Sequence, residues 1–143
     1  MAGDALERLG SDPEVTVVVS TGTEHWRAGE ITLRVNGSGA IEVEHNRSGE
    51  HTDYAGMLSS DELVGFGDEL ARNGFTTLTP DRTTRQPDEH PVTLELRSGS
   101  EVLHHERLPE GDDRLAGILA AYRRMVERVT DGALPFGKAA APR

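Results

Sequence analysis

Two runs of alternating polar and apolar residues lie on either side of a turn signal in the first third of the chain. The runs cover residues 30–35 and 40–45, and Asn36-Gly37-Ser38-Gly39 lies between them. Alternation places every second side chain on one face of a strand, and an Asn-Gly pair supplies the positive φ angles of a tight turn. The sequence therefore predicts a β-hairpin with one buried face. That face holds Ile31, Leu33, Val35, Ile41 and Val43.

Other short apolar runs predict further strands. Residues 14–20 contain five consecutive β-branched residues, which is typical of a central strand and too short for a typical helix. Residues 92–96 and 101–108 predict a second hairpin that turns at Ser98-Gly99. We expect a polar loop over residues 46–58.

A first helix is predicted after this loop. Ser59 and Glu62 have the spacing of a capping box, the apolar side chains that follow recur at helical spacing, and Asn73-Gly74 provides a stop. Gly65 and Gly67 lie inside this helix, where each costs roughly 1 kcal/mol relative to alanine. They indicate either close packing against the sheet or a weakly stable helix.

The last helix begins at Asp112 or Asp113 and keeps an apolar stripe for about four turns. The stripe consists of Leu115, Ile118, Leu119, Tyr122, Met125, Val126 and Val129. The sequence thus predicts an α+β fold in the order β-ββ-α-ββ-α, with an antiparallel sheet of about five strands and two helices packed on one face. We expect an N-terminal segment over residues 1–13, a single domain over residues 14–132 and a flexible tail over residues 133–143.

Charge and composition exclude several classes of function. The 143 residues carry a formal charge of −10, and residues 1–111 alone hold nine basic and twenty-one acidic groups, a charge of −12. Such a surface repels phosphate, so we expect no nucleic-acid partner and no anionic membrane. The absence of cysteine excludes disulfides and thiolate chemistry. No apolar run has signal-peptide or membrane-spanning length, which favours a cytoplasmic protein.

No arrangement of residues indicates catalysis. His104 and His105 are adjacent in a predicted strand and therefore point to opposite faces. His45 and His51 flank a short stretch of chain, at the start of the predicted loop, and could meet at one metal ion, but we expect no native metal and no cofactor. Ser38 lies in a predicted turn rather than at the strand-to-helix elbow of a serine hydrolase.

The residues that favour recognition are exposed ones. Trp26 and Arg27 lie in a predicted loop and have the composition of an interface. Arg82 and Arg85 lie in a polar stretch that could order on a partner. Glu42 and Glu44 project from the same face of one strand, where they could meet a basic protein, bind a cation, act in acid–base chemistry or simply be solvated.

We therefore expect a non-enzymatic protein-binding domain, of inhibitor, immunity or adaptor type, that uses an acidic surface and is a monomer or a homodimer. Two alternatives stay open. One is a small metal-dependent or hydrolytic enzyme that uses the histidines, and the other is a structural domain that oligomerises through an edge strand.

Local motifs also resemble a known type of domain. Residues 57–78, MLSSDELVGFGDELARNGFTTL, follow the first hairpin, and residues 91–108, PVTLELRSGSEVLHHERL, precede the last helix. This arrangement resembles a family of small uncharacterised bacterial domains of hairpin–helix–hairpin–helix order, and is more distantly similar to emfourin-type protease inhibitors. The similarity covers about residues 30–130 and implies an α+β fold. The early glycine- and phenylalanine-bearing motif of emfourin is absent here, so no functional residue is carried over.

Overall fold

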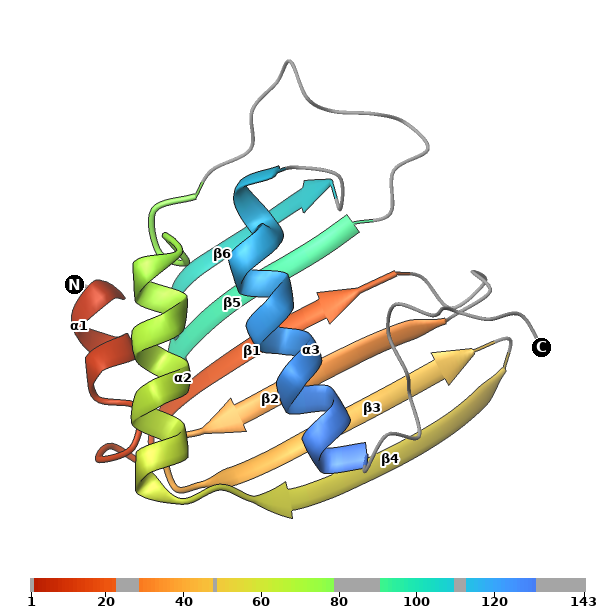
Figure 1. Cartoon of the computed structure of the whole chain (residues 1–143), viewed down its shortest axis with the longest axis horizontal. Helices are drawn as coiled ribbons and strands as arrows, with labels where there is room; N and C mark the ends of the chain where they lie inside the picture. The colour runs from red at the N-terminus through yellow and green to blue at the C-terminus, as the bar shows by residue number, and fades with distance from the viewer. Residues whose placement is uncertain (1, 23–28, 48, 79–90, 110–112, 131–143) are drawn as a thin grey trace.

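The computed structural model describes residues 2–22, 29–47, 49–78, 91–109 and 113–130, which form one antiparallel sheet with helices against it (Figure 1). The six strands lie in the order β4-β3-β2-β1-β5-β6. The elements along the chain are α1 (Ala2–Glu7), β1 (Val15–Thr21), β2 (Glu30–Asn36), β3 (Ala40–Arg47), β4 (Glu50–Met57), α2 (Ser60–Arg72), β5 (Pro91–Ser98), β6 (Glu101–Pro109), the 3-10 turn η2 (Asp113–Leu115) and α3 (Ala116–Thr130).

The α+β class, the antiparallel sheet and both predicted hairpins are confirmed. The β-branched run of residues 15–19 lies in β1, near the middle of the sheet, as expected for a strand with neighbours on both sides. The predicted count of five strands and two helices, and with it the element order, is wrong. The described residues contain a sixth strand, β4, and an additional N-terminal helix, α1.

Strand β4 occupies most of the region that we expected to be a loop. It pairs antiparallel with β3, and Gly49 at the connection has a φ of 87°. All but two of its eight side chains are exposed, because β4 is an edge strand. Tyr54 on the helix-facing side packs against the core, but the rest of the strand needs no apolar alternation, so its sequence carries no strand pattern.

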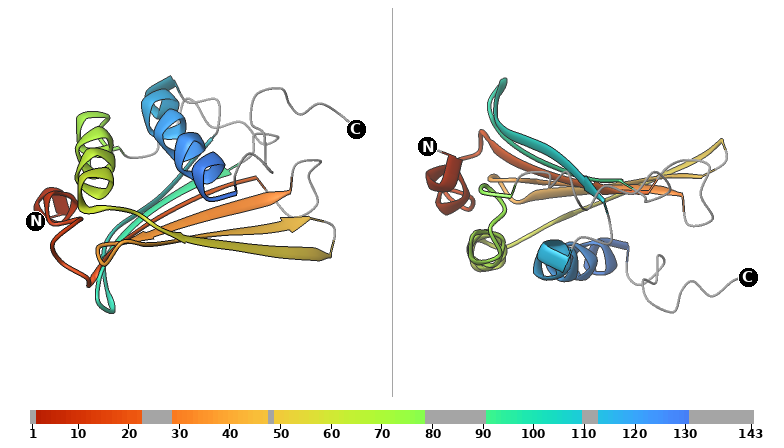
Figure 2. Two further views of the ribbon diagram at one scale, coloured as in Figure 1. Left: turned by 60° about the horizontal axis from the view of Figure 1, so that its bottom comes forward. Right: turned by 90° about the horizontal axis from the view of Figure 1, so that it is seen from above.

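Helix α1 adds to the core from outside the region predicted as the domain. Ala5, Leu6 and Leu9 are buried, and α1 packs against α2 beside the sheet (Figure 2). The close approach needs Gly67, since a Cβ at that position would lie 2.7 Å from the carbonyl oxygen of Leu6. A Cβ at Gly65 would meet no atom within 4 Å. Of the two glycines, only Gly67 is explained by packing, and the neighbour is α1 rather than the sheet. The boundary at residue 14 stays a prediction.

The core fills the space between the sheet and the pair α2 and α3, which lie on the same face (Figure 2). The alternate strand residues predicted from the first hairpin are all buried on this face. One polar network crosses the core: the Tyr122 hydroxyl on α3 donates to the Ile31 carbonyl at 2.9 Å and contacts the Thr21 hydroxyl at 2.9 Å. This network fixes α3 to β1 and β2, because a buried hydroxyl without a partner is costly.

The turn between β2 and β3 uses its glycines differently from the prediction. The positive φ, 103°, falls on Gly39, whose N–H donates to the Asn36 carbonyl. Gly37 instead donates its N–H to Val15, and a Cβ there would lie 1.8 Å from the Asp12 carbonyl oxygen. Gly39 therefore supplies the positive φ of the turn. Gly37 instead permits the close contact with the backbone at and just before the start of β1.

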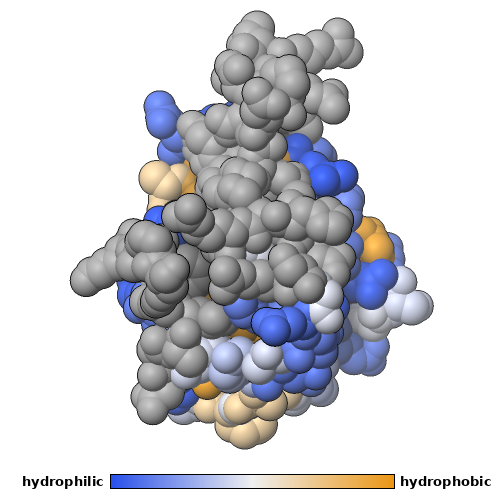
Figure 3. Space-filling model, turned by 90° about the vertical axis from the view of Figure 1, so that its right-hand side faces the viewer, coloured by the Kyte–Doolittle hydropathy of each residue, from blue (hydrophilic) through white to orange (hydrophobic). Residues whose placement is uncertain are grey.

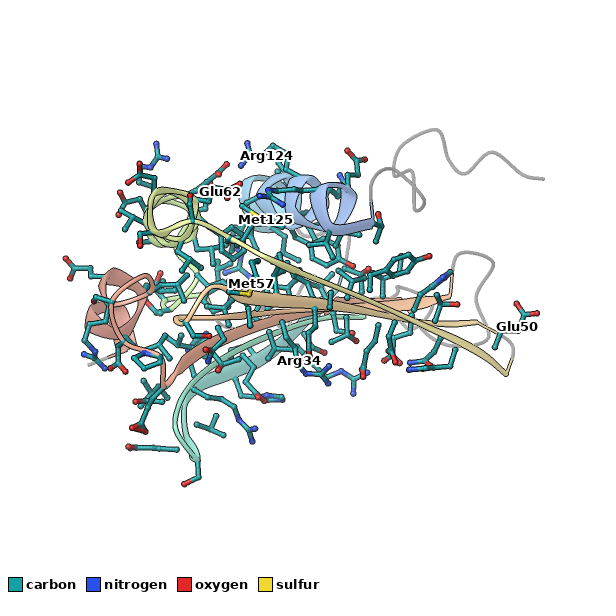
Figure 4. All side chains as sticks on the ribbon, turned by 90° about the horizontal axis from the view of Figure 1, so that it is seen from below. Arg34, Glu50, Met57, Glu62, Arg124 and Met125 are labelled. Carbon is teal, nitrogen blue, oxygen red and sulfur yellow. The ribbon has the colours of Figure 1, made fainter. Side chains whose placement is uncertain are left out.

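Ion pairs link the outer surfaces of α2 and α3. Arg128 donates to both carboxylate oxygens of Glu62, at 2.6 and 3.0 Å, and Arg124 pairs with Glu69. Glu62 also closes the predicted capping box with Ser59. In Figure 4, Glu62 and Arg124 lie on the helical side of the molecule and Arg34 on the opposite side of the sheet. These ion pairs join two helices that are far apart in sequence.

The described surface is mainly hydrophilic where Figure 3 shows it, with small separate apolar areas. Its largest exposed apolar side chains, Met57, Val64 and Val102, lie on three different elements. None of the helices in the described part of the chain is long and apolar enough to cross a membrane.

Candidate functional site

The candidate site is the face of the sheet that α2 and α3 leave uncovered, here called the open face (Figure 2). No described residue packs over it as a second layer. The strand register identifies the residues of the open face, because residues directly opposite each other point to the same side of the sheet. The residues of its centre are Thr16, Val18, Ser20, Thr32 and Thr93. Its ionisable residues are Glu30, Arg34, Glu42, Glu44, His51, Asp53, Glu95, Arg97, His105 and Arg107.

The centre of the open face carries short, weakly polar side chains. Thr16, Val18 and Ser20 on β1 are half-buried, since their neighbours on β2 and β5 flank them. The hydroxyls of Ser20 and Thr32 lie 3.0 Å apart across the strands. Small hydroxyl and methyl groups of this kind can contact either a protein surface or water.

Charge is distributed unevenly over the open face. On β2, β3 and β4 it carries four carboxylates, those of Glu30, Glu42, Glu44 and Asp53, against one arginine, a formal charge of −3. We call these strands' part of the open face the acidic half. On β5 and β6 there are two arginines against one carboxylate, a charge of +1. The difference gives the open face a defined polarity.

The predicted pair Glu42 and Glu44 lies in the acidic half, on one face of β3 as expected. Arg34 on β2 lies opposite Glu42 in register and forms an ion pair with Glu44, with Arg34 Nη1 3.0 Å from Glu44 Oε1. Glu42 is exposed. The other predicted partner-binding residues, Trp26, Arg27, Arg82 and Arg85, lie outside the described residues.

A second group of polar side chains lies where β3 meets β4. Asp53 is directly opposite Glu44, and His51 is directly opposite Asn46. His51 Nε2 is 2.7 Å from Asp53 Oδ1, and His51 Nδ1 is 2.5 Å from Asn46 Oδ1. The sequence indicated neither Asn46 nor Asp53, because their positions depend on the pairing of a strand that we expected to be a loop.

The structure overturns the hypothesis that His45 and His51 meet at one ion. His45 lies opposite Ile31, whose side chain is buried, and so faces the helices, whereas His51 faces the open side. The two histidines are therefore on opposite faces of the same hairpin.

The prediction that His104 and His105 point to opposite faces is confirmed. His105 lies opposite Glu95 on the open face, and its Nδ1 is 2.9 Å from Glu95 Oε1. His104 lies opposite Leu96, and its ring centroid is 6.2 Å from that of Phe75. Its Nε2 is buried without a hydrogen-bond partner among the described residues. Burial lowers the pKa of His104 below its usual value of 6.5 because the charged form loses its hydration.

Comparison with models of known protein families and with curated proteins finds no match to this chain. The resemblance noted from the sequence therefore stays a prediction.

Proposed function

We propose that this chain is a non-enzymatic protein-binding domain whose open face meets a basic surface of a partner protein. One observation carries the proposal: the open face has no covering layer among the described residues, and its acidic half carries a charge of −3.

The charge of the open face supports partner binding more strongly than its exposure does. Antiparallel sheets commonly leave one face in water, so an uncovered face is not by itself a binding surface. A concentration of one charge on part of that face steers an oppositely charged partner and fixes its orientation. The net charge of −10 repels acidic partners generally, and the acidic half provides a defined place where a basic one can dock.

The short side chains at the centre of the open face suit the same role. Threonine, serine and valine side chains offer a surface without deep relief, over which a partner can exclude water. Glu30 and Glu42 border this centre on β2 and β3. A partner with lysines or arginines around a small apolar patch would match the arrangement.

The proposal is tested with two double charge reversals that change the net charge by the same amount. Glu30→Lys with Glu42→Lys alters the acidic half, and Asp68→Lys with Glu101→Lys alters exposed positions on α2 and at the β5–β6 turn. Each protein is used to capture partners from a lysate of the source cells, at about 0.05 M and about 0.5 M salt.

The proposal requires a protein that the unaltered chain and the α2–turn variant both capture, that the acidic-half variant fails to capture, and that high salt releases. Cross-linking followed by mass spectrometry should then place the partner against β2 and β3. Capture that is equal for both variants, capture that ignores salt, or self-association as the only interaction seen by light scattering would each contradict it.

A further inference from the structure

We propose that Glu44, His51 and Asp53 form a binding site for a divalent transition-metal ion of the zinc class on the open side of the β3–β4 hairpin. The proposed site shares Glu44 and Asp53 with the acidic half, but its test uses the metal ion alone and needs no protein partner. It departs from the expectation of no metal drawn from the sequence.

The hairpin register brings the three side chains together. Glu44 and Asp53 are directly opposite each other, and His51 is two residues from Asp53 on the same face of β4. One ligand atom from each residue can be chosen so that all three lie within 4.8 Å of one another. Among the described residues, no other group of three or more histidine or acidic side chains meets this distance condition.

The contacts of His51 direct its Nε2 toward the two carboxylates. Both ring nitrogens face oxygen atoms, Nδ1 that of Asn46 and Nε2 that of Asp53. A protonated imidazole donates to both of them, whereas a neutral one donates to only one, so a proton and a metal ion compete for Nε2. When Nδ1–H donates to the Asn46 carbonyl, the lone pair of Nε2 is directed at a carboxylate. A metal ion that replaces the proton at Nε2 would take Nε2 and the two carboxylates as ligands, and His51 Nε2 and Asp53 Oδ1 would move apart from their 2.7 Å contact to admit it.

Asn46 then acts as a positioning residue. Metal-binding histidines usually donate their other ring N–H to an oxygen acceptor, which fixes the tautomer and the orientation of the ring. Asn46 lies opposite His51 on the neighbouring strand and offers that acceptor at 2.5 Å.

The ligand set selects the class of metal. One imidazole and two carboxylates suit zinc and its neighbours, whereas calcium and magnesium prefer oxygen ligands alone. His51 and Asp53 are exposed, so water completes the coordination. The negative charge of the acidic half adds a general attraction for the ion.

Arg34 competes with the ion for Glu44. Its guanidinium lies 3.0 Å from Glu44 Oε1 and places a positive charge beside the site. Removing that charge should therefore strengthen metal binding, an effect that a merely structural role of these residues would not produce.

The experiment is titration of the full chain, without a histidine tag and after treatment with a chelator, with Zn²⁺ in a calorimeter and with Co²⁺ followed by visible absorption. We expect one ion per chain. His51→Gln should weaken binding by roughly 100-fold, Asn46→Ala by roughly 10-fold, and Arg34→Gln should tighten it by about 2- to 5-fold.

The matched control is His105→Gln. His105 also lies on the open face and contacts a carboxylate, Glu95, but Arg97 pairs with that same carboxylate at 2.9 Å. This variant should bind zinc as the unaltered chain does. Absence of binding to the unaltered chain, equal binding by the His51 and His105 variants, or weaker binding by Arg34→Gln would overturn the proposal. Circular dichroism of each variant verifies that it is folded.

Discussion

The two faces of the sheet are built from alternate residues of the same strands, yet different interactions determine them. On β2, Leu33 and Val35 are fully buried beneath the helices, while Thr32 and Arg34, which alternate with them, face the open side. On the covered face, the size and shape of each side chain decide whether it fits, since buried side chains pack as densely as crystals of small organic molecules. The open face is specified by charge and hydrogen bonding, which tolerate change at little cost in stability. The comparison indicates that stability and recognition can be altered separately on one strand.

The largest loss of stability is expected from a substitution on the covered face. Leu33→Ala should lower the free energy of unfolding by about 2–5 kcal/mol, because a fully buried leucine leaves a cavity. Its neighbour Thr32→Ala, on the open face, should change it by at most about 1 kcal/mol, since the hydroxyl contact with Ser20 is half-exposed. Urea unfolding followed by circular dichroism measures both. Equal losses would mean that the open face is itself covered.

A second prediction tests whether α1 packs closely against Gly67 of α2. Gly67→Ala should destabilise the protein by about 1–3 kcal/mol because its Cβ would press on α1. Gly65→Ala, two residues away in the same helix, should stabilise it by about 1 kcal/mol through helix propensity. Thermal unfolding of the two variants distinguishes these outcomes, and a loss of stability in both would show that α1 is not the neighbour that matters.

A third prediction concerns His104, an ionisable side chain on the covered side of β6. Its pKa is lowered by burial, so the unfolded chain takes up a proton at a higher pH than the folded one. Stability should therefore fall as the pH drops below about 6.5 and continue to fall until the folded pKa is reached. His104→Leu should remove this part of the pH dependence, as measured by urea unfolding between neutral and mildly acidic pH. His105→Leu, on the open face, is the control. An unchanged profile in the His104 variant would contradict the assignment.

A fourth prediction concerns the ion pairs on the outside of the helices. Arg128, together with the backbone of Ser59, lowers the pKa of Glu62 from 4.5 to about 2. Because the folded pKa is below the unfolded one, this contribution is complete above pH 4.5 and is lost as the pH falls toward 2. Glu62→Gln should flatten that part of the acid-unfolding curve, while Glu127→Gln on α3 should not. Similar curves for Glu62→Gln and the unaltered protein would show that the exposed pair contributes nothing measurable.

The smallest expected effect on stability is on the acidic half. Glu42→Gln should change the free energy of unfolding by less than about 0.5 kcal/mol, because Glu42 is exposed and lies outside the packed core. The same substitution should weaken capture of a basic partner. Its stability is measured by urea unfolding, and a large loss would show that the open face contributes to folding as well as to recognition.

Much of the fold could be predicted because it depends on local patterns. The hairpin alternation at residues 30–45, the β-branched run at residues 15–19, the capping box at Ser59 and the stripe of the last helix each determine an element with little help from the rest of the chain. The opposite orientation of His104 and His105 follows from the same two-residue period. The open-face position of Glu42 and Glu44 was predictable for that reason.

The rest was decided by tertiary structure. Strand β4 has no apolar pattern and exists because its backbone groups pair with those of β3, which the sequence does not encode locally. The need for Gly67 depends on the approach of α1, and the group formed by Glu44, His51 and Asp53 depends on register across a turn. By itself the sequence determined which side chains alternate and where helices begin. Only the folded chain decided which strands are neighbours, and hence which of its many carboxylates share a site, because pairing depends on contacts between residues that the sequence keeps apart.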